Sequence, residues 1–192
     1  MRELKVYKTH PDVVLPKYGT AQAACFDLAY NPAGKTHYKA YTRDNILFEQ
    51  AIYPPDDLII LDPGVRALIP TGLIFDIPEG WSIRVHPRSG LALKQGLILS
   101  NCEGVIDSDY FHETFIMTWN TSNVRQMISP GDRIAQAEVV PVIQVELVET
   151  TVQPVQKTDR IGGYGSTGVS ETVKKHWPDL VKEENKELVY GR

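Results

Sequence analysis

Turn residues interrupt the apolar runs of this chain about every ten residues, and this spacing limits its possible folds more than any other feature. The run at 72–77 stops at Pro78-Glu79-Gly80, and the run at 81–85 stops at His86-Pro87. Comparable aliphatic and β-branched runs occupy residues 58–61, 65–69, 97–100, 113–119 and 133–149. Short strands with turn residues between them are typical of an all-β sandwich or barrel. One short helix is expected after Pro87, where leucines recur through residue 97.

Two segments depart from this pattern. Residues 30–57 are rich in Tyr, Pro and Asn and alternate only weakly, so they are interpreted as an inserted loop or a small subelement without a clear core face. Residues 169–192 are charged and follow a glycine-rich tract, so they are expected to form a C-terminal extension, either a short helix at 180–189 or a solvated tail. The expected organisation is therefore one β domain over residues 1–168 and an extension over 169–192.

Composition excludes several classes of protein. Hydrophobic residues make up 42% of the 192 residues, which predicts a packed core. Lys and Arg total 20 against 24 Asp and Glu, and this net charge of −4 argues against direct binding to nucleic acid. No apolar run is long enough to span a bilayer, and no secretory signal is expected. Cys25 and Cys102 lie far apart without metal-ligand spacing, which favours a reducing cytoplasm.

The segment Asn101-Cys-Glu-Gly-Val-Ile-Asp-Ser-Asp-Tyr110 is the most unusual stretch of the chain. Asp107 and Asp109 are two residues apart, so on a strand both carboxylates would face the same side. Gly104 and the Asp-Ser-Asp turn predict a hairpin with Tyr110 at its base. The pattern is typical of a polar β-turn capped by aspartates. It also suits a general base that activates water, and spacing alone leaves both interpretations open.

Two further segments suit the binding of phosphate groups. Residues 87–90, Pro-Arg-Ser-Gly, place a guanidinium, a hydroxyl and free backbone N–H groups at the start of the expected helix. Residues 162–168, Gly-Gly-Tyr-Gly-Ser-Thr-Gly, follow Arg160 and are too rich in glycine for a strand or helix. They are interpreted as a loop that closes over phosphates, with a flexible linker as the alternative. No P-loop sequence is present.

Five segments in this order resemble the homotrimeric dUTP diphosphatases, or dUTPases, across roughly residues 20–168. The first is Ala-Ala-Cys-Phe-Asp-Leu at 23–28, and the second is the Pro-Arg-Ser-Gly segment with the residues after it. The third is the Asn101–Tyr110 segment, the fourth is Gly-Asp-Arg-Ile-Ala-Gln at 131–136, and the fifth is the glycine-rich segment. The resemblance implies a jelly-roll-like β-sandwich whose trimer shares each active site among three chains. It also implies hydrolysis of dUTP to dUMP and pyrophosphate, which limits uracil in DNA and supplies dUMP for thymidylate synthesis.

The resemblance further implies a role for each matching residue. Asp107 would orient and deprotonate the attacking water. Groups that bind the uracil edge and the deoxyribose would be Asn101, Gly104, Val105, Ile106 and Tyr110. Groups that hold the phosphates would be Arg88, Ser89, Gly90 and Gln136. Groups of the closing segment would be Arg160, Gly163, Tyr164, Gly165, Ser166 and Thr167. Asp27 would lie near a Mg²⁺ ion, contacting it through water while the triphosphate binds it directly.

The sequence also departs from the usual family pattern. Phe111-His112 follows Tyr110 where Arg-Gly is usual, Arg160 stands one residue closer to the glycine pair, and Tyr164 replaces Phe. Added segments such as 30–57 are common in phage and viral members. Two rival functions are considered. A dCTP deaminase would need a catalytic Glu where this chain has Met117, and a regulatory protein with a dUTPase fold would act through the insertion.

Overall fold

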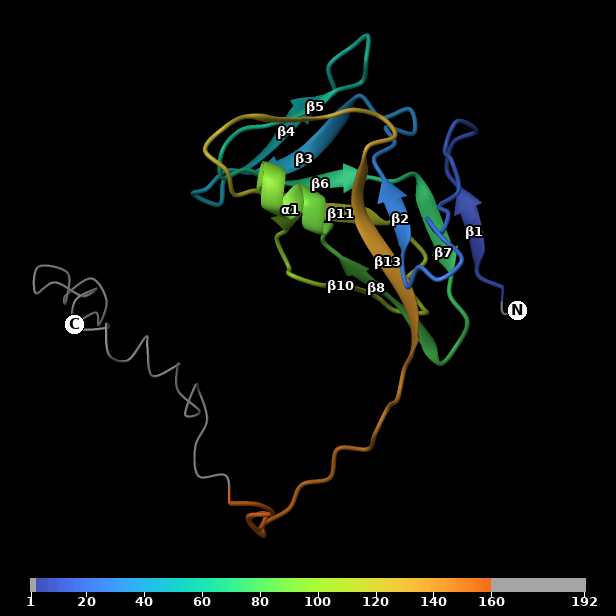
Figure 1. The fold of residues 1–192 in the computed structure, drawn as a ribbon, viewed down its shortest axis with the longest axis vertical. Helices are drawn as coiled ribbons and strands as arrows, with labels where there is room; N and C mark the ends of the chain where they lie inside the picture. Colours follow the sequence, from blue (N-terminus) through green and yellow to red (C-terminus); the bar gives the residue numbers. More distant parts are fainter. Residues whose placement is uncertain (1–2, 160–192) are drawn as a thin grey trace, which may run out of the picture. The chain divides into compact units, whose positions relative to one another are not determined.

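The computed structural model describes residues 3–159 and consists almost entirely of antiparallel strands (Figure 1). The strands are β1 (Lys5–Lys8), β2 (Phe26–Ala29), β3 (His37–Tyr41), β4 (Leu47–Ala51), β5 (Ile59–Leu61), β6 (Arg66–Pro70), β7 (Leu73–Asp76), β8 (Trp81–His86), β9 (Leu97–Leu99), β10 (Gly104–Ile106), β11 (Phe115–Asn120), β12 (Gln126–Ile128) and β13 (Arg133–Pro141). The helix α1 (Ser89–Gln95) lies where leucine spacing predicts it. The expected all-β class is therefore confirmed. No helix among the described residues is long and apolar enough to cross a membrane.

Two main sheets organise the compact unit formed by residues 1–145. One has the order β10-β8-β13-β2, and the other has the order β4-β3-β6-β11-β9. Two smaller sheets, β1-β7 and β12-β5, complete the unit. Figure 1 shows β2, β13 and β8 as neighbours, with β1 lying against β7. A second unit begins at Glu146, and its described part, residues 146–159, contains no helix or strand.

Alternation along the strands explains how the core forms. In β11, Ile116, Thr118 and Asn120 are buried, whereas Phe115, Met117 and Trp119 are exposed. Successive strand residues point to opposite faces, so one face of β11 joins the core and the other faces outward. Buried side chains from both main sheets meet in a single apolar cluster. The strand pattern therefore produces the sandwich that the sequence predicts.

Residues 30–57 contain a hairpin, which matches the expected small subelement and not the loop, but they do have a core face. The strands β3 and β4 pair with each other, and β3 also pairs with β6. Tyr38 is 3% exposed and Ala40 is fully buried. The Tyr38 hydroxyl donates to the Ile60 carbonyl oxygen at 2.6 Å and lies 2.8 Å from Gln50 Oε1. Burial raises the pKa of this phenol above its ordinary value. The sequence did not predict this face because only every second residue of β3 is buried, and polar residues such as Lys39 stand between them.

The apolar run at 133–149 forms a strand only as far as Pro141. Beyond it, Val142 donates its N–H to the Gly80 carbonyl oxygen at 2.8 Å, and strand pairing stops. Ile143, Val145 and Leu147 are 87%, 71% and 92% exposed. The part of this run beyond Pro141 is therefore not a strand in this chain taken alone.

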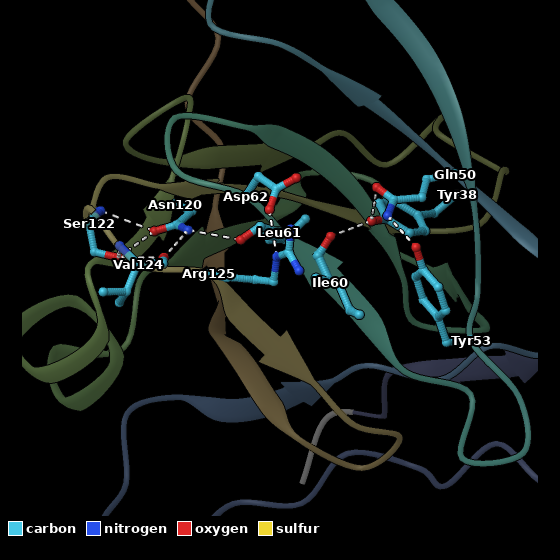
Figure 2. Close-up of polar contacts among 10 residues, drawn as sticks. All are labelled: Tyr38, Gln50, Tyr53, Ile60, Leu61, Asp62, Asn120, Ser122, Val124 and Arg125. Atoms are coloured by element: carbon cyan, nitrogen blue, oxygen red, sulfur yellow. Dashed lines mark hydrogen bonds and ion pairs between the residues drawn. The ribbon is translucent and has the colours of Figure 1, made fainter.

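Buried polar groups hold the short strand β5 to the rest of the sandwich (Figure 2). Asn120 is fully buried, and its Nδ2 donates to the carbonyl oxygens of Leu61 at 2.9 Å and Val124 at 2.8 Å. Its Oδ1 accepts from the N–H of Ser122 at 3.0 Å and from the Ser122 hydroxyl at 2.8 Å. On the surface, Arg125 Nε pairs with Asp62 Oδ1 at 2.7 Å. Because the amide satisfies four polar groups at once, Asn120 organises the turn between β11 and β12.

Replacing Asn120 by Leu should destabilise the protein. The change keeps the branched shape of the side chain but leaves buried carbonyl and N–H groups without partners, so the free energy of unfolding should fall by about 2–3 kcal/mol. Thr118→Val is the matched control on the same strand, because the buried Thr118 hydroxyl has no partner among the described residues. Its effect should stay within about 0.5 kcal/mol. Urea denaturation measures both, and equal losses would contradict the assignment.

Candidate active site

A polar cavity of about 450 Å³ opens where β8 leads into α1. Its lining comes from the loop before β2, from the first turns of α1 and from β13: Gly19, Thr20, Ala23, Cys25, Asp27, Arg88, Ser89, Gly90, Leu91, Lys94, Gln95 and Gln136. All the described residues expected to hold phosphates therefore lie together. The register explains this grouping, because Gln136 pairs with His86 on one side and with Asp27 on the other.

Asp27 fixes two arginines at the cavity. Its Oδ1 lies 2.9 Å from Arg88 Nε, and its Oδ2 lies 3.0 Å from Arg133 Nη1. The Asp27 side chain is 22% exposed, so these pairs are partly shielded from water. Arg88 Nη1 also donates to the Arg133 carbonyl oxygen at 2.9 Å, and Gln136 Nε2 donates to the Pro87 carbonyl oxygen at 3.0 Å. The guanidinium of Arg88 is thereby held in one orientation at the cavity.

Arg133 is a member of this cluster that sequence reasoning missed. Its neighbour Asp132 closes the preceding turn by accepting from the Ser129 N–H at 2.8 Å, whereas Arg133 reaches Asp27 on the adjacent strand. The pairing of β13 with β2 determines this contact, and no local sequence signal reveals it.

The described residues do not form a metal cage. Among residues 3–159, no three His, Cys, Asp or Glu side chains gather closely enough to hold a metal ion. Both carboxylate oxygens of Asp27 already accept from arginines. A divalent cation at this cavity would need its oxygen ligands chiefly from a bound phosphate chain and water.

A second cavity, of about 290 Å³, lies at the hairpin that carries β10. Its lining is mostly apolar, with one side-chain amide: Leu68, Val85, Leu99, Asn101, Gly104, Val105, Ile106, Tyr110, Thr114, Phe115, Ile116 and Met117. The expected nucleoside-binding residues are thus all found together. Gly104 allows the hairpin to approach β8 closely, because a Cβ there would lie 3.1 Å from Val85 Cβ. The residues of the apolar wall from β6 and β11 were not singled out from the sequence for this role.

Asp107 lies at the beginning of the turn that follows this cavity. The strand β10 ends at Ile106, so the two aspartates occupy a turn, as the Asp-Ser-Asp pattern predicts, and not one face of a strand. Tyr110 donates its N–H to the Asp107 carbonyl oxygen at 3.2 Å. Asp107 itself is exposed to solvent. An exposed carboxylate at the edge of a shaped cavity can accept a proton from a water molecule.

Asp107 and the row that contains Asp27 lie at opposite corners of one chain's four-stranded sheet. Ile106 pairs with Ile83, so Asp107 continues to the level of Ser82, whereas the row of Asp27 and Gln136 crosses β8 at His86. The distance from Ser82 to His86 along a strand is about 13 Å, and three strand spacings from β10 to β2 add about 14 Å across the sheet. Asp107 and Asp27 of one chain are therefore about 20 Å apart.

The remaining expected site residues lie outside the described part of the chain: Arg160, Gly163, Tyr164, Gly165, Ser166 and Thr167.

Each of the two cysteines lies at or near a different cavity. Cys25 lines the polar cavity, and Cys102 lies exposed in the β10 hairpin, next to Asn101. Burial, followed by the nearby carboxylates of Glu138 and Asp27, raises the pKa of the Cys25 thiol above its ordinary value. Both thiols are free of disulfides.

Comparisons with known proteins agree with each other. The family model described as dUTPase matches residues 51–168. The deoxyuridine 5'-triphosphate nucleotidohydrolase of Nautilia profundicola is 38% identical over 167 residues, which cover 86% of this chain and 99% of that protein. The enzyme of the same name from Finegoldia magna is 41% identical over 155 residues, covering 80% of this chain and 91% of that protein.

Solved structures share the fold at lower identity. The dUTPase from Streptococcus mutans has a TM-score of 0.57 and 24% identity, covering 76% of this chain and 99% of that one. The dUTPase of Staphylococcus bacteriophage 80alpha with dUPNHPP has a TM-score of 0.65 and 21% identity, covering 88% of this chain and 100% of that one. The expected β-sandwich of this type is therefore confirmed.

Alkylation of the two cysteines should distinguish the cavities. At pH 8, Cys102 should react with iodoacetamide at least about tenfold faster than Cys25, because a raised pKa and partial burial lower the thiolate supply at Cys25. The Cys25 rate should still rise above about pH 9, since its thiolate fraction is still growing there. Inorganic triphosphate should slow the alkylation of Cys25 more than that of Cys102. Peptide mass spectrometry measures each site, and stronger protection of Cys102 would contradict the phosphate assignment.

Proposed function

The chain belongs to the dUTPase family and hydrolyses dUTP to dUMP and pyrophosphate, and from this premise we propose which residues carry the reaction and how the chains assemble. The observation that carries the proposal is the pair of chemically different cavities. One is apolar with a single amide, which suits a pyrimidine ring and its hydrogen-bonding edge. The other presents Arg88 and free N–H groups, which suit a triphosphate.

The apolar cavity binds the nucleoside. Asn101 and the backbone of Gly104, Val105 and Ile106 pair with the uracil edge, and the close packing of β10 on β8 leaves no room for a 5-methyl group. Tyr110 packs against the deoxyribose and excludes a 2′-hydroxyl. Such rejection works through clashes and buried unpaired groups, which discriminate better than a missing contact does.

The polar cavity binds the phosphate chain. Arg88, Ser89, Gly90 and Gln136 hold its oxygens, with Arg88 oriented by Asp27 as described above. Arg160 and residues 163–167 complete the closure over the substrate. A Mg²⁺ ion bound with the substrate would be held chiefly by phosphate oxygens and water, and it would supply neutralisation of phosphate charge. The role of Asp27 toward that ion is indirect, because its own oxygens bind arginines.

Asp107 acts as the general base. Its carboxylate accepts a proton from a water molecule that attacks a phosphorus atom, and pyrophosphate leaves. The surrounding groups contribute by positioning the substrate and excluding bulk water.

Each complete site needs more than one chain. The Asp27 row and Asp107 of a single chain are roughly 20 Å apart. A phosphate chain bound near Asp27 therefore cannot also place its reacting phosphorus next to Asp107 of the same chain. We therefore propose a homotrimer in which the nucleoside cavity of one chain meets the phosphate cavity of its neighbour. The exposed apolar side chains of Ile143, Val145 and Leu147, beyond β13, support such an assembly, since association would bury them.

The rival functions receive less support. Met117 lines the nucleoside cavity where a deaminase of this fold would need a proton-transferring Glu, and a thioether cannot fill that role. The residues 30–57 form part of the five-stranded sheet, so their role as a separate regulatory segment has no support from the fold. We retain residues 1–168 as the catalytic domain and 169–192 as an extension. The cytoplasm is the proposed compartment, in keeping with free thiols.

Asp107→Asn should lower kcat for dUTP at least about 10²-fold, because the amide keeps the shape but accepts no proton at neutral pH. Nucleotide binding should remain within about threefold of wild type, since the charge change lies outside the cavity walls. Pyrophosphate release measures turnover, and titration with a non-hydrolysable analogue measures binding. Asp109→Asn, two residues along the same turn, is the matched control. Near-normal turnover in the Asp107 variant would exclude the assignment.

Mixing two inactive variants should restore activity. Arg88→Ala disables the phosphate cavity and Asp107→Asn disables the base, so a mixed trimer regains a site wherever the intact parts meet. After co-refolding of equal amounts, random mixing gives roughly a quarter of wild-type activity per site by the counting of a closed three-membered ring. Each variant refolded alone is the control. No recovery in trimers that mass measurement shows to be mixed would refute the shared site.

A further inference from the structure

A partly buried ion pair links the hairpin segment to the nucleoside cavity. Lys35 Nζ lies 2.6 Å from Glu113 Oε2, with side chains that are 30% and 12% exposed. The other Glu113 oxygen accepts from the Gly72 N–H at 2.9 Å. For comparison, the Lys5–Asp76 pair has a separation of 4.0 Å and side chains that are 79% and 75% exposed. The Lys35 pair is therefore shielded from water, where charge-assisted contacts hold geometry more firmly.

The local sequence places Lys35 for this contact. The turn Asn31-Pro32-Ala33-Gly34 has positive φ values at both Ala33 and Gly34. Lys35 donates its N–H to the Pro32 carbonyl oxygen at 2.8 Å, and the Asn31 N–H donates to the Pro70 carbonyl oxygen at 3.0 Å. The turn is thereby fixed to the end of β6, directly beside the corner that carries Gly72.

Gly72 is equally constrained. Its φ is +69°, and a Cβ there would lie 2.4 Å from Val13 Cγ2. The corner also holds Thr114, whose carbonyl oxygen accepts from the Thr71 hydroxyl at 2.6 Å and whose N–H donates to the Leu73 carbonyl oxygen at 2.8 Å. Glu113 is therefore anchored through both its side chain and the residue that follows it.

Glu113 in turn holds Tyr110. The Tyr110 hydroxyl donates to the Glu113 carbonyl oxygen at 3.1 Å, and Tyr110 lines the nucleoside cavity. Lys35 Nζ also lies 5.6 Å from the ring centroid of Phe115, another wall residue of that cavity. Residues 107–114 contain no strand, so Tyr110 is positioned by the Glu113 contact together with its N–H bond to Asp107 and an edge-on contact of its ring with His112 at 5.7 Å.

We propose that Lys35 is a positioning residue for sugar selectivity, acting through Glu113 on Tyr110. This inference rests on the proposed role of Tyr110 against the deoxyribose. With the ion pair intact, the Tyr110 ring occupies the space that a 2′-hydroxyl would need. Without it, the 110–115 segment relaxes and the cavity accepts a ribonucleotide more readily. Lys35 lies 75 positions before Tyr110 in the sequence, within the segment 30–57 that the sequence alone indicates as an insertion.

The experiment compares kcat and KM for dUTP and UTP in the full-length enzyme. Lys35→Met should lower the ratio of kcat/KM for dUTP over UTP about tenfold, which is modest beside the loss that misplacement by 1 Å can cause. The change should appear mainly in KM, with kcat for dUTP within about twofold of wild type. Lys35→Arg should retain the ratio within about threefold, because it keeps the charge. Lys5→Met, which removes the exposed pair, is the matched control and should leave the ratio unchanged.

Two further variants separate positioning from stability. Lys35→Met leaves a partly buried carboxylate without its cation, and adding Glu113→Gln removes that charge. The double variant should regain thermal stability while selectivity stays low. An unchanged ratio in Lys35→Met with a lowered Tm would overturn the inference and leave Lys35 a structural residue. Tyr110→Ala tests the premise, because an unchanged ratio there would overturn the role of Tyr110 itself, whatever Lys35 does.

Discussion

The hydrogen-bond register of the sheet β10-β8-β13-β2 is the constraint on which the active site depends. It sets Asp27, Gln136 and His86 in one row, and it sends Asp107 off the far end of β10. A slip of one residue would turn every side chain of a strand to the opposite face, so buried residues such as Ile83 and Ala137 hold the register in place. The same packing that makes the core therefore decides which polar groups meet, and it keeps the two halves of one chain's site apart.

Ion pairs orient the arginines of the proposed phosphate cavity before any nucleotide binds. A protein with a net charge of −4 gathers Arg88 and Arg133 around one carboxylate, so their attraction to phosphate is local. Asp27 loses its availability as a direct metal ligand through these pairs, while it restricts the rotamers of both arginines. Groups that are already oriented need little reorganisation when charge moves during phosphoryl transfer, and this preorganisation is a large part of what such a site contributes.

The sequence was sufficient for features that local chemistry determines. Many strand ends follow from turn residues, α1 follows from leucine spacing after Pro87, and the described residues of the second and third motifs gather at two cavities. It was insufficient where pairing between distant segments decides. Arg133 reaches Asp27 only because β13 lies beside β2. Tyr38 is buried because β3 joins β6, although its neighbours in the sequence are polar.

The corner at Gly72 shows how the fold and the chemistry are joined. It receives the Asn31–Lys35 turn from one side and the Glu113–Thr114 segment from the other. Both arrive there because β3 and β11 flank β6 in the same sheet. A wall of the nucleoside cavity thus rests on the hairpin at 30–57, which is part of the sandwich itself. Under the proposed role of Lys35, a change in that hairpin shifts Lys35 and so moves Glu113 and the Tyr110 side of the cavity, because closely packed elements transmit displacement.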